Sequence, residues 1–249
     1  MTDIDLRGYR TRLLDQGEGP PTVLVHGTPL DLGSWDPLVA ELKGRRTIRY
    51  DVRGHGSAAD VPVPGWTDLA DDVIAVLDRL ALADAHLVGH SWGAQIVQRA
   101  ALDHPERVTR LSILCSRAAP FPSFHTVAAG LRAGTADRTA SLSRWFDPDE
   151  LSRPDPLVPI IRARLEDAVT EAWASALDMI ADFDVLDDLH RIDVPVDVVA
   201  AGQDGVGDPE HMARIAAGVR HGELHVVDGA HHLLPLQRPD LVAAALKMG

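Results

Sequence analysis

Short apolar runs alternate with longer amphipathic stretches along most of this chain. The β-rich runs at 22–26, 47–50 and 85–88 each end at a glycine or a polar loop, and helix-like spacing follows each of them. In the stretch after 47–50, for example, Leu69 and Leu77 lie on one apolar stripe. Buried strands that alternate with helices at this interval predict an α/β fold with a mostly parallel, doubly wound sheet.

The alternation of strands and helices resumes toward the end of the chain, and a loosely alternating segment precedes the first buried strand. Residues 6–14 alternate loosely before a turn rich in glycine and proline, which predicts an edge strand or a hairpin. Ser34 and Thr67 stand where a capping residue would begin two of the early helices. The later elements are strand-like runs at 111–115, 196–200 and 224–227 and helix-like runs at 209–218 and from Pro239.

The alternation of strands and helices breaks after Ser116. The stretch from there to about Asp188 contains helical patches and proline-containing loops without a convincing strand, and it is too long for a plain loop. We therefore predict one domain whose core is formed by residues 1–116 and 189–249, with a helical lid insertion at 117–188.

Composition excludes several classes of partner. The chain has 249 residues and a formal charge of −13, whereas binding to a phosphate backbone needs a basic face, so nucleic acid is not an expected partner. No window has the ~18 continuous apolar residues of a membrane span, and the first residues show no basic flank followed by an apolar segment. We expect a cytoplasmic protein. The single cysteine, Cys115, lies in an apolar run and is expected in the core.

Polar residues that carry chemistry follow four of the predicted strands. Ser91 stands in Gly89-His90-Ser91-Trp92-Gly93 between a strand and a helix, a pattern that predicts a sharp turn presenting the serine hydroxyl. Asp204 and the pair His231-His232 follow two later strands. Because the carboxyl ends of parallel strands meet at one edge of a sheet, these side chains are expected to face one crevice. A serine needs a base and an orienting acid, and the order serine, aspartate, histidine is typical of an α/β sheet scaffold.

The chain resembles the α/β-hydrolases. Within that family it is most similar to the 3-oxoadipate enol-lactone hydrolases, and related esterases and cofactor-free haloperoxidases share most of the same features. The segments that carry the resemblance are His26-Gly27-Thr28-Pro29, Asp51-Val52-Arg53-Gly54-His55-Gly56, Gly89 to Gly93, Arg144-Trp145-Phe146, Ala181-Asp182-Phe183-Asp184, Gly202-Gln203-Asp204, Ile192-Asp193-Val194-Pro195 and Asp228-Gly229-Ala230-His231-His232.

The resemblance implies a role for each of these positions. Ser91 would be the nucleophile, Asp204 the acid and His232 the base, while the backbone N–H groups of Thr28 and Trp92 would bind the oxyanion.

Two of these assignments have competitors in the sequence. His232 is preferred over His231 because family members place the base seven residues before a proline that opens the last helix, here Pro239. His231 stays open. Asp204 is preferred over Asp208, which is more simply a helix cap before Pro209, and over Asp228, which is expected in a loop.

The insertion is expected to cover the crevice and to decide which substrates enter. Trp35, Trp145 and Trp173 are predicted to line an apolar substrate pocket. A substrate carboxylate would need a cation, and the arginines that the sequence places near the insertion are Arg117, Arg132, Arg138 and Arg144, with none singled out.

The histidines do not suggest a metal site. His26, His55 and His90 lie in the turns of motifs and are expected to brace loops, and the other histidines lack the spacing of metal ligands. No metal and no cofactor are expected.

The function predicted from these residues is that of a serine hydrolase. Its substrate would be a small-molecule ester or lactone, cleaved through an acyl-serine intermediate. The same site is compatible with a perhydrolase of the haloperoxidase type or a C–C bond hydrolase, and a non-catalytic small-molecule-binding homologue is the alternative outside the enzymes. The sequence does not determine the oligomeric state.

Overall fold

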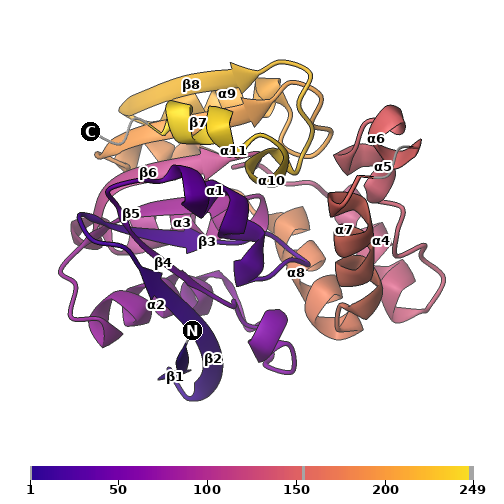
Figure 1. Cartoon of the computed structure of the whole chain (residues 1–249), viewed down its shortest axis with the longest axis horizontal. Coiled ribbons are helices and arrows are strands. Elements are labelled where there is room, and N and C mark those ends of the chain that lie inside the picture. The colour runs from indigo at the N-terminus through magenta and orange to yellow at the C-terminus, as the bar shows by residue number, and fades with distance from the viewer. Residues whose placement is uncertain (1, 153–154, 247–249) are drawn as a thin grey trace.

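The protein folds around one eight-stranded sheet within the described residues, 2–152 and 155–246 of a computed structural model (Figure 1). The strand order is β1-β2-β4-β3-β5-β6-β7-β8. β1 and β2 form an antiparallel hairpin, β2 pairs antiparallel with β4, and all later neighbours are parallel. The strands are β1 (Thr2–Leu6), β2 (Tyr9–Gln16), β3 (Pro21–Val25), β4 (Arg46–Tyr50), β5 (Ala85–His90), β6 (Val108–Leu114), β7 (Pro195–Ala201) and β8 (His221–Val227).

Helices cover both faces of the sheet. On β3, Leu24 packs in one apolar cluster with residues of α1 and α11, whereas Val23 and Val25 point into the larger cluster on the other side. This double burial explains why the central strands are continuous apolar runs, and it confirms the doubly wound α/β prediction. The helices are α1 (Asp36–Glu41), α10 (Leu234–Gln237) and α11 (Pro239–Ala245) on one face and α2 (Trp66–Arg79), α3 (Trp92–Asp103) and α9 (Pro209–Gly218) on the other.

A group of helices separates β6 from β7. It consists of α4 (Ser123–Arg132), α5 (Leu142–Trp145), α6 (Pro148–Ser152), α7 (Leu157–Asp167) and α8 (Thr170–Asp182). No strand occurs in the described part of 115–194. Figure 1 shows these helices gathered at one end of the molecule, beyond the arrowheads of the parallel strands. The helical character of the insertion is as expected, while its division from the core at 117 and 188 stays a prediction.

Short 3-10 turns change where two helices begin. The described residues contain the 3-10 turns η1 (Leu32–Trp35), η2 (Gly56–Ala58), η3 (Pro105–Arg107) and η4 (Leu186–Arg191). Ser34 lies inside η1, whose first amide groups are capped by Asp31, and α2 begins at Trp66 rather than after Thr67. The predicted caps at Ser34 and Thr67 are therefore wrong, whereas Asp208 does cap α9 by accepting from the His211 amide at 3.0 Å.

Trp35 is a core residue rather than part of a substrate pocket. It is 1% exposed and packs in the smaller apolar cluster with Leu38, Leu42 and residues of α11. Its place at the end of η1 directs the ring to this face of the sheet, away from the insertion. The prediction that Trp35 lines the pocket is therefore wrong, while Cys115, fully buried in the same cluster, is in the core as expected.

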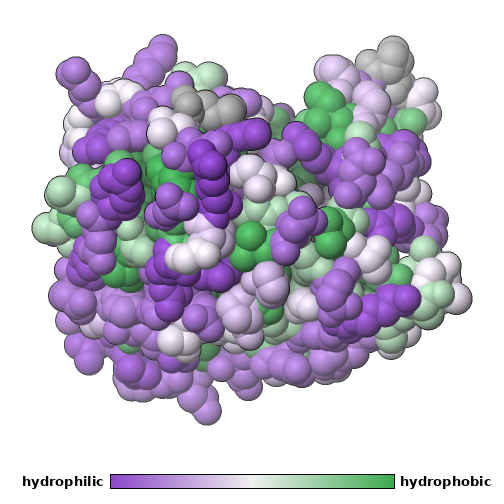
Figure 2. Space-filling view, turned by 90° about the horizontal axis from the view of Figure 1, so that it is seen from below, coloured by the Kyte–Doolittle hydropathy of each residue, from purple (hydrophilic) through white to green (hydrophobic). Residues whose placement is uncertain are grey.

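The surface is mainly hydrophilic. Figure 2 shows polar residues over most of one face, with smaller apolar areas between them. Among residues 2–152 and 155–246, no helix is long and apolar enough to cross a membrane.

Candidate active site

Ser91 occupies a sharp turn between β5 and α3. Its φ of 55° lies in the left-handed region, which a residue with a side chain adopts only when the surroundings enforce it. Gly89 and Gly93 let the strand, the turn and α3 approach closely, since a Cβ on Gly93 would collide with the carbonyl oxygens of Val25 and His26. The two glycines of the motif are therefore required by packing, and the turn leaves Ser91 at the base of a pocket.

Ser91, His232 and Asp204 form one hydrogen-bonded chain. The Ser91 hydroxyl lies 2.9 Å from His232 Nε2, and His232 Nδ1 lies 2.8 Å from Asp204 Oδ2. The histidine and the aspartate are each 4% exposed. Because an ionised carboxylate only accepts, His232 Nδ1 donates to Asp204, which leaves Nε2 free to accept the serine proton.

The carboxylate of Asp204 is held ionised. Burial alone would raise its pKa, but the neighbouring His232 and hydrogen bonds from the backbone of Val206 and Gly207 outweigh it, so the pKa lies below the ordinary value. The Val206 amide donates to Oδ1 at 2.7 Å, which fixes one oxygen and leaves the other for His232. A negative charge in this position stabilises a protonated His232.

Arg117 braces the loop that carries Asp204, a role that sequence reasoning missed. Its guanidinium donates to the Val206 carbonyl at 2.7 Å and to His211 Nε2 at 2.7 Å, while His211 Nδ1 lies 2.8 Å from Asp208. The residue is 5% exposed. Nothing in the local sequence points to this contact, because it joins positions 89 residues apart.

Of the two adjacent histidines, only His232 faces Ser91. The His231 ring nitrogen Nδ1 is buried without a hydrogen-bond partner in the described part of the chain, and no contact joins it to Ser91 or Asp204. His90 supports the chosen residue, since its Nε2 donates to the His232 carbonyl at 2.8 Å. Trp145 stacks on the other side of the His232 ring, with 5.8 Å between centroids.

The expected loop-bracing histidines hold the loops around the site together. The Val52 amide donates to His26 Nε2 at 3.0 Å, which ties the loop after β3 to the loop after β4. His55 bonds to the Thr28 hydroxyl at 2.7 Å. Burial lowers the pKa of His55 and of His90 to about 3, so both rings are neutral at ordinary pH.

The backbone amides of Thr28 and Trp92 are the two predicted oxyanion donors. Neither the Thr28 nor the Trp92 N–H donates a hydrogen bond to another of the described residues. Trp92 is the first residue of α3, where the helix dipole also favours negative charge. Thr28 lines the same pocket as Ser91. The two predicted donors thus remain without a partner among the described residues, and their role in catalysis stays a prediction.

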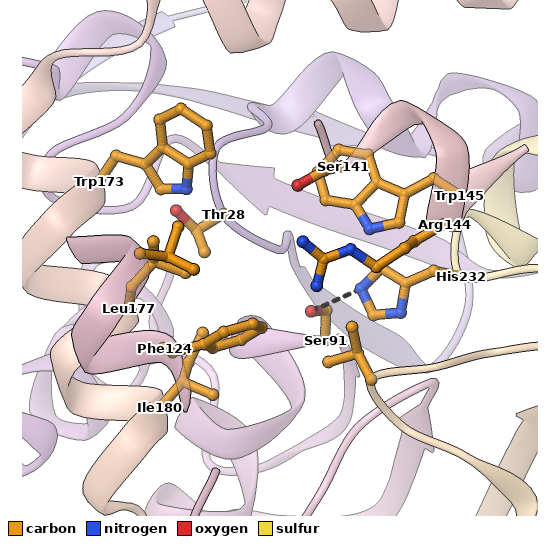
Figure 3. Close-up of a pocket in the computed structure, with 12 residues that line it drawn as sticks. Thr28, Ser91, Phe124, Ser141, Arg144, Trp145, Trp173, Leu177, Ile180 and His232 are labelled. Carbon is orange, nitrogen blue, oxygen red and sulfur yellow. Dashed lines mark hydrogen bonds between the residues drawn. The ribbon is translucent and has the colours of Figure 1, made fainter. Parts of the chain in front are cut away.

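The pocket above Ser91 is small and mostly apolar. It encloses about 500 Å³, including its open mouth, and the insertion supplies most of its wall. Figure 3 shows Trp173 and Thr28 toward one end and Trp145, Arg144 and His232 toward the other, with Ser91 next to His232. The lining residues are Thr28, Ser91, Phe124, Val127, Ser141, Arg144, Trp145, Trp173, Leu177, Ile180, Val206 and His232.

Trp145 and Trp173 lie where the sequence places them. Trp173 shares the pocket wall with Leu177 and Ile180 of the same helix, a spacing of i, i+4, i+7 that the sequence contains but that core packing would equally explain. Sequence reasoning therefore missed Leu177 and Ile180. It had no signal for Val206, which only the tertiary fold brings to the site.

Only one of the four arginines near the insertion lines the pocket. It is Arg144, and within residues 2–152 and 155–246 no ion pair or hydrogen bond engages its guanidinium. Arg132 pairs with Glu171 and Asp178 on the surface, and Arg138 donates to the carbonyls of Leu165 and Ala168 at the end of α7.

A second set of a serine, a histidine and an aspartate is buried on the neighbouring strands β5, β6 and β7. His86 Nε2 is 2.7 Å from Ser112 Oγ, and Ser112 Oγ is 3.1 Å from Asp197, whose carboxylate also pairs with Arg110. Ser112 is fully buried, so the set lacks access for a substrate. In the described part of the chain, no cluster of histidine, cysteine and acidic side chains has the arrangement of a metal site.

The fold and the serine turn together define a hydrolase of the α/β class. The protein belongs to the alpha/beta hydrolase family, whose model matches residues 22–245.

Known relatives of this chain act on several substrates. (E)-2-((N-methylformamido)methylene)succinate hydrolase of Acinetobacter baylyi is 27% identical over 259 residues, which cover 98% of this chain and 95% of that protein. 3-oxoadipate enol-lactonase 2 of the same organism is 28% identical over 223 residues, which cover 87% of this chain and 83% of that protein. The crystal structure of the enol-lactonase from Burkholderia xenovorans superposes with a TM-score of 0.91 at 26% identity, over 98% of each chain. These similarities confirm the resemblance found in the sequence.

Proposed function

We propose that this protein is a serine hydrolase of small carboxylic esters or lactones. The observation that carries the proposal is the hydrogen-bonded chain from Ser91 through His232 to Asp204, whose serine lines the pocket. Its serine donates to a base whose other nitrogen is held by a buried carboxylate, which is the arrangement that activates a hydroxyl for acyl transfer.

Acylation uses the groups that surround Ser91. His232 Nε2 takes the hydroxyl proton while Ser91 Oγ attacks the substrate carbonyl carbon, and the amides of Thr28 and Trp92 receive the negative oxygen. Collapse of the tetrahedral intermediate breaks the bond to the leaving oxygen, which takes the proton from His232. An ester loses its alcohol at this step, whereas a lactone opens and keeps its alcohol on the acyl chain.

Deacylation repeats these steps with water. His232 removes a proton from a water molecule that attacks the acyl-serine carbonyl, and then returns it to Ser91 Oγ as the acid leaves. Asp204 stabilises the protonated His232 in both halves of the reaction. The reaction needs no further group, since the proton is taken and returned by the same ring.

Labelling of the serine tests this proposal. A fluorophosphonate probe should give one adduct that peptide mass spectrometry maps to Ser91, and Ser91→Ala should lose both the adduct and hydrolysis of para-nitrophenyl acetate. Folded wild-type protein that neither reacts with the probe nor hydrolyses the ester would overturn the proposal and favour a ligand-binding role.

Arg144 supports a substrate that carries a carboxylate. Its guanidinium lines the pocket without a partner in the described part of the chain, near Ser91 and His232 in Figure 3. A carboxylate would form charge-assisted hydrogen bonds there and offset the acidic charge of the whole protein. The succinate and oxoadipate derivatives in the names of two relatives have this chemistry.

The carboxylate preference can be tested with paired esters. Arg144→Met should raise KM for monomethyl succinate about 10-fold or more and leave KM for methyl butanoate nearly unchanged. Arg132→Met is the matched control, because that arginine is paired on the surface outside the pocket. An equal change for both esters would show that Arg144 does not select the charge.

A further inference from the structure

Thr28 lies between the pocket and a buried histidine. It lines the cavity above Ser91, yet its side chain is largely enclosed, since the residue is 8% exposed. The Thr28 hydroxyl lies 2.7 Å from His55 Nε2, and the other nitrogen of that ring, Nδ1, lies 2.9 Å from the Arg53 carbonyl. The three groups form a chain that leads from the backbone into the pocket.

The direction of each hydrogen bond in this chain follows from chemistry. A carbonyl oxygen can only accept, so the hydrogen of the second bond sits on His55 Nδ1. Burial keeps this ring neutral by lowering its pKa to about 3, which leaves Nε2 with a lone pair and no hydrogen. The hydrogen between Thr28 and His55 therefore comes from the threonine.

The side chain of Thr28 consequently offers the pocket an acceptor and no donor. Its only hydrogen is engaged with His55, so the remaining lone pairs of Oγ1 can bind an O–H or N–H group of a substrate. An ether oxygen or a halogen at the same place has no hydrogen to donate to Oγ1 and receives none from it. Such a substrate would leave the Thr28 oxygen unsatisfied when the pocket closes around it. A threonine locked in this way distinguishes a hydroxyl from a methoxy group.

Covalent geometry relates this acceptor to the reacting carbonyl. In threonine, Oγ1 stands three bonds from the backbone nitrogen, and the Thr28 N–H is one of the two proposed oxyanion donors. In a 2-hydroxy ester, the hydroxyl oxygen likewise stands three bonds from the carbonyl oxygen. The acceptor and the donor of the substrate are therefore separated by the same number of bonds as the donor and the acceptor of Thr28.

We propose that Thr28 selects substrates with a hydroxyl on the carbon next to the reacting carbonyl, that is, 2-hydroxy esters or lactones. The proposal rests on the function proposed above, and it deepens that function by naming the substrate class. Thr28 acts here as a specificity-determining residue that contacts substrate, and His55 positions its hydrogen.

Two esters of similar size test the selection. Methyl 2-methoxypropanoate has a methyl group in place of the hydroxyl hydrogen that methyl 2-hydroxypropanoate would donate to Thr28. The measured quantity is the ratio of their kcat/KM values, compared between wild type and variants so that the difference in size cancels. Wild type should prefer the hydroxy ester, and Thr28→Val should lower the ratio about 3- to 10-fold. Thr28→Ser should keep it within about twofold, because the serine hydroxyl can donate to His55 in the same way.

A substitution of His55 tests the same hydrogen bonds independently. His55→Phe removes the acceptor for the threonine hydrogen, so the hydroxyl of Thr28 becomes able to donate to the methoxy oxygen and the ratio should fall. In wild-type protein, ¹⁵N NMR of the imidazole should show His55 protonated at Nδ1 and unprotonated at Nε2. This measurement decides the direction of the bonds even if Thr28→Val does not fold.

The outcomes separate this inference from the proposed function. Ser91-dependent hydrolysis without a preference for the hydroxy ester, an unchanged ratio in Thr28→Val, or a hydrogen on His55 Nε2 would each overturn the inference alone. Absence of hydrolysis of both esters together with an unlabelled Ser91 would overturn the proposed function and this inference with it.

Discussion

Replacement of Asp204 by asparagine should abolish most of the activity without a loss of folding. The two side chains have nearly the same shape, so the substitution tests the charge and the direction of one hydrogen bond. The Val206 amide donates to Oδ1 at 2.7 Å and will keep an oxygen at that position. The asparagine amide nitrogen must then replace Oδ2, which lies 2.8 Å from His232 Nδ1.

This exchange places a donor against a donor. His232 can avoid the clash only by moving its hydrogen from Nδ1 to Nε2, where it points at Ser91 Oγ and can no longer take the serine proton. A triad histidine in the wrong tautomer lowers kcat by about 10⁴-fold, which corresponds to about 5 kcal/mol of transition-state stabilisation. The lost charge adds to the effect, since a protonated His232 then lacks its carboxylate partner.

The assay is steady-state hydrolysis of para-nitrophenyl acetate at neutral pH, with thermal unfolding measured on the same samples. Asp228→Asn is the matched control, because this exposed aspartate follows β8 and touches neither His232 nor Ser91, and its kcat should stay within about twofold. A decrease of less than about 10-fold in folded Asp204→Asn would refute the assignment of the acid.

Three further changes test other parts of the site. His232→Ala should lower kcat about as much as loss of the serine, whereas His231→Ala should retain most of the activity; the reverse result would exchange the two roles. Because the folded pKa of His55 and of His90 lies near 3, the unfolded chain binds more protons below pH 6.5, so stability is complete above that pH and falls below it. Each ring should cost about 2 kcal/mol at pH 5 relative to pH 7.5, and urea midpoints that do not change with pH would contradict this. Gly93→Ala should reduce the yield of folded protein, measured by circular dichroism of the soluble fraction, because its Cβ meets backbone oxygens that cannot move.

The serine turn and the class of fold were predictable because their signals are local. A strand, a glycine-flanked serine and a helix occur within about 20 residues, and the close packing of Gly93 against Val25 explains why that position needs a glycine. The alternation of buried strands and amphipathic helices is likewise a property of short segments. The same signals predicted the parallel sheet and its two covered faces.

Trp35 shows where local signals fail. Its sequence neighbourhood resembles that of a pocket-lining residue, because it follows the loop that contains Thr28 by only a few positions. The 3-10 turn that ends at Trp35 nevertheless directs the ring into the cluster under α11. Periodicity identifies a buried ring, but it does not tell which of two buried environments receives it.

The sequence by itself determined the sheet, the helical insertion and the chemical identity of the three candidate catalytic residues, because these depend on residue type, order and short-range pattern. Only the tertiary structure decided that His232 and not His231 reaches Ser91, that Arg117 holds the loop of Asp204, and that the hydrogen of Thr28 is committed to His55. Each of these depends on the direction of a side chain from one element toward another far along the chain. Such directions are set by how the elements pack, which no local pattern specifies.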